Sequence, residues 1–175
     1  IPGSNTDTSF AIRGKAEGVY VVNCYIAASA YGVDFRGCDN HFIKNVVTFC
    51  YNTTYLVGGR NGVIKGCLQN PTALLRCEIP NRVSFVSRGN FNTTLVEPVS
   101  KKQVHLVVVE NAENQLVYNT FSYAPKHLVV NNNSTGTKVI NLGADQVGGT
   151  GVGVGAAMLV MNGGSMKVIN PMRVY

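Results

Sequence analysis

The sequence contains no tryptophan, and only 14% of its 175 residues are charged, nine of them acidic. No stretch of about 18 apolar residues runs unbroken, so the sequence predicts no membrane-spanning helix. The net charge is +6, but the basic residues are dispersed rather than gathered in a run, which argues against a nucleic-acid partner. With so few carboxylates, any acid–base chemistry has few candidate residues.

Five cysteines, an odd number, argue against a disulfide framework, and none of their spacings matches a zinc site. Cys24 and Cys67 occupy equivalent places in the repeat described below, where a free thiol acts as a small core residue. Cys38, Cys50 and Cys77 lie near the ends of predicted turns. No phosphate-binding loop or metal motif occurs, so we expect neither a cofactor nor a metal.

A short sequence pattern recurs along the chain. Asn or Gly precedes a short apolar strand, a turn follows, and a second strand ends in Arg. Its clearest copies are residues 18–26, 41–47, 62–68, 115–121 and 138–142. The copies recur at a period of about 22 residues, and a period of that length built from strands indicates a coil repeat.

Such a repeat buries its apolar face only if successive copies stack, so the sequence predicts an all-β fold, a right-handed parallel β-helix. Alternation within the strands agrees, because Val19 and Val21 can point inward while Tyr20 and Asn23 point outward. At the turns, we expect inward-facing asparagines to lie above one another and to bond along the column. A β-sandwich, which also has many short strands at regular spacing, is the alternative.

Residues 1–175 are expected to form a single β-helix domain. The chain begins abruptly at Ile1, with neither a signal peptide nor an initiator Met, so we expect a piece of a longer protein or a processed chain. Residues 78–102 interrupt the regular spacing of the repeat and contain Pro80, Pro98 and scattered polar residues. There we predict an inserted loop or a lateral hairpin, which often shapes a binding face.

Arginine closes a strand in four copies of the repeat, at Arg13, Arg36, Arg60 and Arg76. Stacked strands lie about 4.8 Å apart, so these side chains are expected to form one stripe on the outer surface. The stripe is either a solvated edge that blocks strand addition or a groove for a polyhydroxylated or anionic polymer. The rigid donor fork of arginine suits the second interpretation.

Asp34 lies beside this stripe. If Val33 and Phe35 point inward, Asp34 and Arg36 point outward together. A carboxylate in that position could act on a bound sugar. The alternative is a surface ion pair of Asp34 with Arg36 or Arg60, which would contribute little to stability.

The neighbours expected for Asp34 in the adjacent copies are Ala11 and Gly58, whose small size would leave room for a sugar ring. Glycoside chemistry needs two carboxyl groups about 5 to 9 Å apart. Asp39 and Asp7 are the nearest candidates for the second, and Glu17 and Glu78 at turns are weaker ones. The candidate substrate-binding residues are Arg36, Arg60, Asp39, Asn40 and His41, although a lone histidine at a turn is more often structural.

Segments 5–26, 31–43, 58–64, 141–145 and 168–173 resemble bacterial inulin fructotransferases that form difructose anhydrides. The resemblance runs over most of the chain. It implies a secreted bacterial enzyme, a homotrimeric right-handed β-helix with active sites between subunits. That family releases the terminal difructosyl unit of inulin by intramolecular transfer without water, using an Asp and a Glu.

The resemblance places the catalytic aspartate at Asp34, in Gly-Val-Asp-Phe-Arg. It places the glutamate a short distance downstream, where this chain has Lys44, Asn45 and Val46 and no Glu. Without a second carboxylate the family reaction is impaired, or the acid comes from elsewhere. Two other classes therefore stay open: another β-helix polysaccharide enzyme, for instance one acting on polyuronates, and a non-catalytic glycan-binding β-helix such as part of a phage tail spike.

Overall fold

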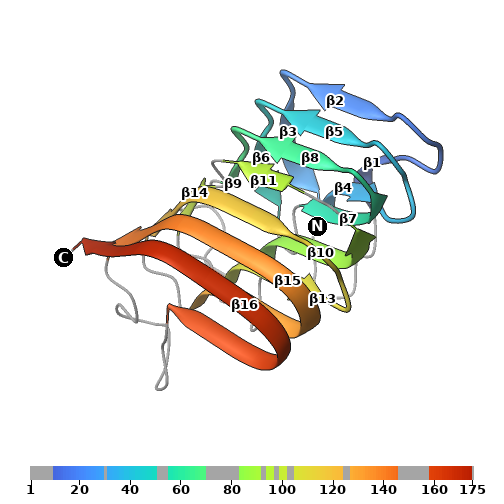
Figure 1. Ribbon diagram of the computed structural model, residues 1–175. Helices are drawn as coiled ribbons and strands as arrows, with labels where there is room; N and C mark the ends of the chain where they lie inside the picture. The colour runs from blue at the N-terminus through green and yellow to red at the C-terminus, as the bar shows by residue number, and fades with distance from the viewer. Residues whose placement is uncertain are drawn as a thin grey trace.

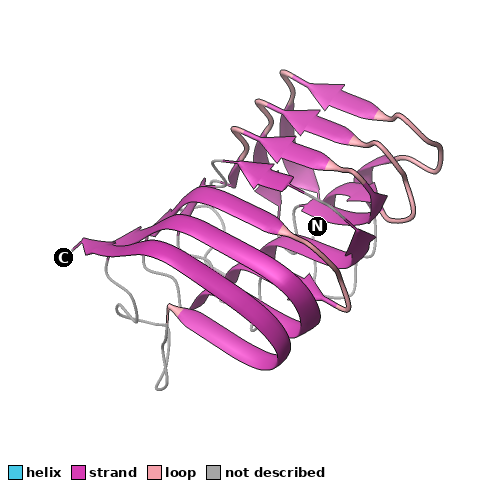
Figure 2. Cartoon of the chain, viewed as in Figure 1, coloured by secondary structure: helices cyan, strands magenta, loops and turns pink. Residues whose placement is uncertain are grey.

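The computed structural model describes residues 10–29, 31–50, 55–69, 83–91, 94–96, 99–101, 105–123, 127–145 and 158–174. Within these ranges the chain is all-β, its strands pair in parallel, and no helix is present (Figures 1 and 2). No described segment is therefore a helix long and apolar enough to cross a membrane. The expectation of an all-β chain with parallel strands is confirmed.

The described strands lie in three stacks, each built by parallel pairing between successive copies of the repeat. The first stack contains β1 (Phe10–Arg13), β4 (Tyr31–Phe35), β7 (Tyr55–Arg60), β10 (Val83–Phe91) and β13 (His105–Glu110). The second contains β2 (Tyr20–Val22), β5 (Phe42–Lys44), β8 (Val63–Lys65), β11 (Thr94–Val96) and the start of β14 (Leu116–Tyr123). The third contains β3 (Tyr25–Ser29), β6 (Val47–Cys50), β9 (Leu68–Gln69), β12 (Val99–Lys101) and the end of β14. The long strands β15 (His127–Asp145) and β16 (Leu159–Val174) run through all three stacks.

In the second stack, alternation of buried and exposed side chains explains why these residues form strands. Val21, Ile43 and Ile64 are aligned in register at the centres of β2, β5 and β8, and all three are buried. Their neighbours point to the opposite face, as the period of two in a strand requires. Tyr20, next to Val21, is 68% exposed. The predicted alternation is therefore confirmed.

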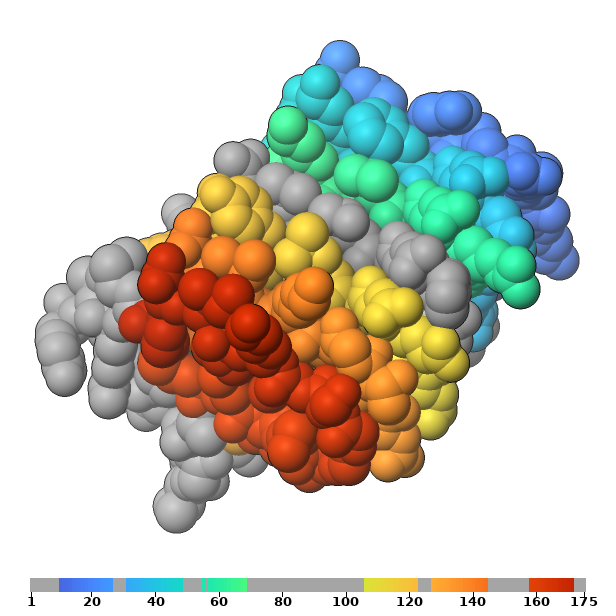
Figure 3. Space-filling model, in the orientation of Figure 1, coloured from blue at the N-terminus to red at the C-terminus, as the bar shows by residue number. Residues whose placement is uncertain are grey.

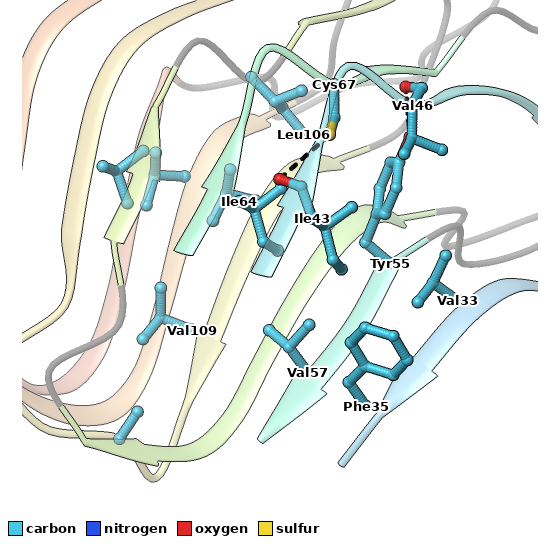
Figure 4. Close-up of a cluster of buried hydrophobic side chains, with 14 of the residues drawn as sticks. Val33, Phe35, Ile43, Val46, Tyr55, Val57, Ile64, Cys67, Leu106 and Val109 are labelled. Atoms are coloured by element: carbon cyan, nitrogen blue, oxygen red, sulfur yellow. Dashed lines mark hydrogen bonds between the residues drawn. The ribbon is translucent and has the colours of Figure 1, made fainter. Parts of the chain in front are cut away.

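The core lies between the stacks and is filled by aliphatic and aromatic side chains (Figure 4). Phe35 and Tyr55 are among the largest fully buried residues, and the Tyr55 hydroxyl donates a hydrogen bond to the carbonyl of Val46 at 2.8 Å. Each fully buried side chain of this size contributes roughly 1.5 to 3 kcal/mol through the hydrophobic effect. Side chains from different copies therefore share one continuous core.

Free thiols belong to this core, as predicted. Cys38 and Cys67 are buried and Cys24 is half-buried against the same cluster. Burial raises the pKa of the Cys67 thiol to about 11, so the unreactive protonated form prevails at neutral pH. Cys77 lies outside the described residues.

Asparagines occupy the corners between strands. Asn23 and Asn45 have positive φ, a conformation that asparagine tolerates better than most residues. The Asn45 side-chain amide donates to the Asn23 side-chain oxygen at 3.1 Å, Asn141 donates to Asn119 at 2.9 Å, and Asn170 donates to Asn141 at 3.2 Å. The predicted stacking is confirmed. Asn23 points outward as predicted, and because Asn23 and Asn45 are both exposed at the outer corner, the asparagines that stack here are not inward-facing ones.

Strands β10, β11 and β12 fall within residues 78–102, where the sequence predicted an inserted loop or a lateral hairpin. Each pairs in parallel with strands of the neighbouring copies, β10 with β7 and β13, β11 with β8 and β14, and β12 with β9 and β14. A register shift against β7 between Ser87 and Asn90 accommodates part of the irregular spacing. The prediction is therefore wrong for the described strands, which continue the stacks.

Candidate functional site

Asp34 lies on the outer face of the first stack. Its neighbours in β4, Val33 and Phe35, point into the core and are buried. The outward orientation predicted for Asp34 and Arg36 follows from this alternation. The Arg36 side chain is exposed on the same face.

Two arginines hold the Asp34 carboxylate. Arg36 donates from Nε to Oδ1 and from Nη2 to Oδ2, both at 2.9 Å, and its backbone N–H reaches Oδ1 at 3.2 Å. Arg13, from the preceding copy, donates from Nε to Oδ2 at 3.1 Å. The Asp34 side chain is only 6% exposed, whereas both arginine side chains are nearly half exposed. Arginine thus covers the carboxylate and presents its remaining donors to solvent.

These contacts decide the ionisation of Asp34. Burial by itself raises the pKa of the carboxyl. The hydrogen bonds from the Arg36 side chain and backbone, with the charges of Arg36 and Arg13, outweigh burial and bring the pKa below its ordinary value. Asp34 is therefore ionised at neutral pH and is a weak proton acceptor.

An open pocket of about 390 Å³ surrounds this carboxylate. It is lined by Arg13, Gly14, Lys15, Asp34 and Arg36, and we call it the arginine pocket. Beside it the rings of Phe10 and Tyr31 stack with centroids 4.8 Å apart, and the Arg13 guanidinium lies 4.8 Å from the centre of the Phe10 ring. Three cationic side chains and one carboxylate can together donate to and accept from the oxygens of a ligand.

The register of the first stack corrects the neighbours expected for Asp34. Asp34 is paired with Arg13 in β1 and with Leu56 in β7, instead of with Ala11 and Gly58. The space expected for a sugar ring beside the carboxylate is therefore taken by an arginine. The predicted arginine stripe is also broken, because Arg13 aligns with Asp34 and not with Arg36. Arg76, Asp7 and Glu78 lie outside the described residues.

Arg60, Asp39 and Asn40 form a separate group at a corner of the fold. The Arg60 backbone N–H donates to Asp39 Oδ1 at 2.8 Å, and Asn40 Nδ2 donates to Glu17 Oε1 at 2.7 Å. Asn61 donates to Asn40 at 3.4 Å. None of the three predicted residues lines the arginine pocket, so the structure brings together only Asp34 and Arg36 of the predicted site.

His41 is inside the fold. Its side chain is among the largest fully buried ones, with the residue 1% exposed, and Nδ1 lies 2.8 Å from the carbonyl oxygen of Cys38. A carbonyl only accepts, so Nδ1 carries the proton and Nε2 does not. The ring packs near Phe35 and against Gly62. The expected role of His41 in substrate binding is therefore wrong, and the structural alternative is supported.

Burial of His41 predicts a pH-dependent stability. Desolvation lowers its pKa below the ordinary value of 6.5, more than the Cys38 hydrogen bond and the Asp39 charge raise it. Protonation then favours the unfolded chain, so this contribution is complete above about pH 6.5 and is lost as the pH falls below it. Urea unfolding followed by circular dichroism should show a lower midpoint at pH 5 than at pH 7.5. In His41→Gln, which does not titrate, the drop should be smaller, and an equal drop would contradict the assignment.

Lys15, Phe10 and Tyr31 were not among the predicted site residues. The signal that could have found them is the spacing of the inward residues Ile12 and Val33, which pair in register. Aligning the copies on these two residues places Arg13 against Asp34 and Phe10 against Tyr31. Arg13 and Arg36, which the sequence predicted to align with each other, are offset by two residues in the register.

In the part of the chain that the structure describes, no three His, Cys, Asp or Glu side chains gather as a metal site would require. Comparison of the chain with protein-family models, with curated proteins and with solved structures finds no match.

Proposed function

We propose that the protein is a right-handed parallel β-helix that binds a polysaccharide in the arginine pocket. The three stacks of parallel strands support this architecture. Contacting residues in the first copies are 21 or 22 residues apart in sequence, as in Arg13 with Asp34 and Asn23 with Asn45, and those in the last copies are about 30 apart, as in Asn132 with Asn162. A chain that advances by one strand layer per copy stacks its repeats in this way.

One observation carries the binding function: the pocket combines half-exposed cationic donors, fixed by Asp34, with a neighbouring aromatic pair. Arg13, Lys15 and Arg36 line the pocket and offer N–H donors to sugar hydroxyls. The Phe10–Tyr31 pair offers an apolar surface to the C–H face of a sugar ring. Asp34 also fixes the two guanidinium groups in place, which lowers the entropy lost on binding.

An inulin fructotransferase is the second candidate, favoured by the ionised Asp34 in the pocket, at the place of the family's aspartate. With its lowered pKa, Asp34 would stabilise positive charge at the anomeric carbon more readily than it would take a proton. The second carboxylate would come from a neighbouring subunit of a homotrimer, whose active sites in that family lie between subunits. This candidate implies a secreted bacterial enzyme with inulin as its substrate.

Arg36→Gln tests the pocket. It removes two side-chain hydrogen bonds to Asp34 and one cation from the pocket, so affinity for inulin should fall about tenfold. Isothermal titration calorimetry with inulin measures this, and circular dichroism checks that the variant folds. Lys167→Gln, on the second stack, is the matched control and should bind inulin as the wild type does.

Wild-type affinity in Arg36→Gln, or no binding of inulin to the wild type, would contradict the proposal. Incubation with inulin and with polygalacturonate separates the catalytic candidates. A difructose anhydride that forms with the wild type and is lost in Asp34→Asn would establish fructosyl transfer. An unsaturated uronide would instead indicate a polyuronate lyase.

A further inference from the structure

The outer face of the second stack carries a concentration of lysines. In β5 and β8, Lys44 pairs in register with Lys65, and in β15 and β16 Lys138 pairs with Lys167. We call this surface, the outer face of β2, β5, β8, β14 and the aligned parts of β15 and β16, the lysine face. These strands follow one another from β2 to β16, with β11 between β8 and β14 (Figures 1 and 3).

The charge on this face is not compensated. Neighbouring strands are about 4.8 Å apart, and like charges directly opposite on such strands destabilise a sheet. The register rows that contain the four lysines hold no Asp or Glu. Among the described residues, the side-chain ion pairs are those of Asp34 with Arg13 and Arg36. The positive charge of the paired lysines is therefore not balanced by acidic residues in their rows, and a bound polyanion would neutralise it.

Aromatic side chains share the face with the lysines. Tyr20 is highly exposed, and its ring centroid lies 6.1 Å from that of Phe42, the residue paired with it in β5. Tyr118 occupies the row of Lys44 and Lys65 further along the stack. Rings and aliphatic side chains in a flat sheet suit the C–H faces of sugar rings, while the lysines supply the charge.

We propose that the lysine face binds an acidic polysaccharide that runs across the strands along the stack. A linear polymer with a carboxylate on each sugar can meet Lys44 and Lys65 in one register row and, further along the stack, Lys138 and Lys167 in the other outward-facing row. The face offers lysine point charges and no arginine, whereas base readout and bidentate phosphate contacts favour arginine. This surface is separate from the arginine pocket, which lies on the first stack.

The test compares binding of polygalacturonate by the wild type and by the double variant Lys44→Gln/Lys65→Gln. Removal of two adjacent charges should weaken binding about tenfold or more in affinity electrophoresis at low salt. Lys44→Arg/Lys65→Arg keeps the charge and should bind within about twofold of the wild type. Arg60→Gln removes an exposed charge outside both the lysine face and the arginine pocket, and it should leave this binding unchanged. Binding should weaken as salt rises, because exposed charges are screened.

Several results would overturn the proposal. These are equal binding by Lys44→Gln/Lys65→Gln and the wild type, equal binding of fully methyl-esterified, uncharged pectin, and tighter binding of DNA than of polygalacturonate. Sedimentation equilibrium decides the remaining case. A change of oligomeric state in Lys44→Gln/Lys65→Gln would make the face an interface between copies of the chain and would also overturn the proposal.

Discussion

Gly62→Ala is expected to lower the free energy of unfolding by about 3 kcal/mol, the upper part of the usual range for overpacking. A Cβ atom at Gly62 would overlap the Cε1 and Nε2 atoms of His41. The ring cannot easily move away, because it is buried and Nδ1 is bonded to the Cys38 carbonyl. Loss of glycine flexibility in the unfolded chain would stabilise by only about 0.4 to 1 kcal/mol, so the overlap dominates.

Urea unfolding measures this change, and a double-mutant cycle with His41→Ala tests its cause. With the ring removed, the added methyl has room, so the double variant should be at least about 1 kcal/mol more stable than the sum of the single changes predicts. Gly143→Ala is the matched control. Its nearest neighbour would be Phe121 at 3.3 Å, so we expect a small change. Additive effects in the cycle would show that His41 is not the obstacle.

Asn131→Ala is expected to cost about 3 kcal/mol, since it removes two buried hydrogen bonds and one partly buried one and leaves their partners unsatisfied. The Asn131 amide donates to the carbonyls of Ser134 at 3.0 Å and Gly163 at 3.1 Å, and its oxygen accepts from the Thr137 hydroxyl at 2.9 Å. Asn131 is 0% exposed, so water cannot replace these bonds in the folded chain. Because Gly163 belongs to β16, this side chain also ties β16 to β15.

The matched control is Asn162→Ala, which makes the same chemical change on the surface. Asn162 is exposed, and its side chain donates one hydrogen bond, to Asn132 at 2.9 Å. Water can take over that bond, so the loss should stay below about 1 kcal/mol. Thermal and urea unfolding of both variants give the comparison. Similar losses in the two variants would mean that the buried network around Asn131 contributes little.

The parts of the fold that sequence predicted well are those set by local alternation. Val21 is buried and Tyr20 is exposed because a strand directs successive side chains to opposite faces. The recurrence of asparagine at turns likewise predicted the side-chain bonds between copies, such as Asn45 to Asn23. These stacked asparagines face outward, as predicted for Asn23, and not inward as expected for asparagines at turns, because a residue with positive φ turns the chain at a corner where its side chain meets solvent.

The candidate site was harder to predict because it depends on register between copies of unequal length. Aligning Arg13 with Arg36 places Ala11 beside Asp34, but the buried residues Ile12 and Val33 set the pairing and bring Arg13 there instead. A shift of two residues keeps every side chain on its face, so alternation alone cannot detect it. His41 was misplaced for a related reason: turn residues follow no alternation, and only the closed corner with Gly62 shows that the ring points inward.

The hydrogen bonds between stacked asparagine side chains have a direction along the stack. This direction bears on how such a chain can change in length. Asn45, Asn141 and Asn170 each donate to the asparagine of the preceding copy, so these bonds all run in the same direction along the stack. Layers with an asparagine at this corner therefore present a donor to the preceding layer and an acceptor to the next. A gene duplication or deletion that adds or removes one whole layer leaves matching surfaces at the junction. Gain or loss of complete layers is thus the change in length that this arrangement tolerates best.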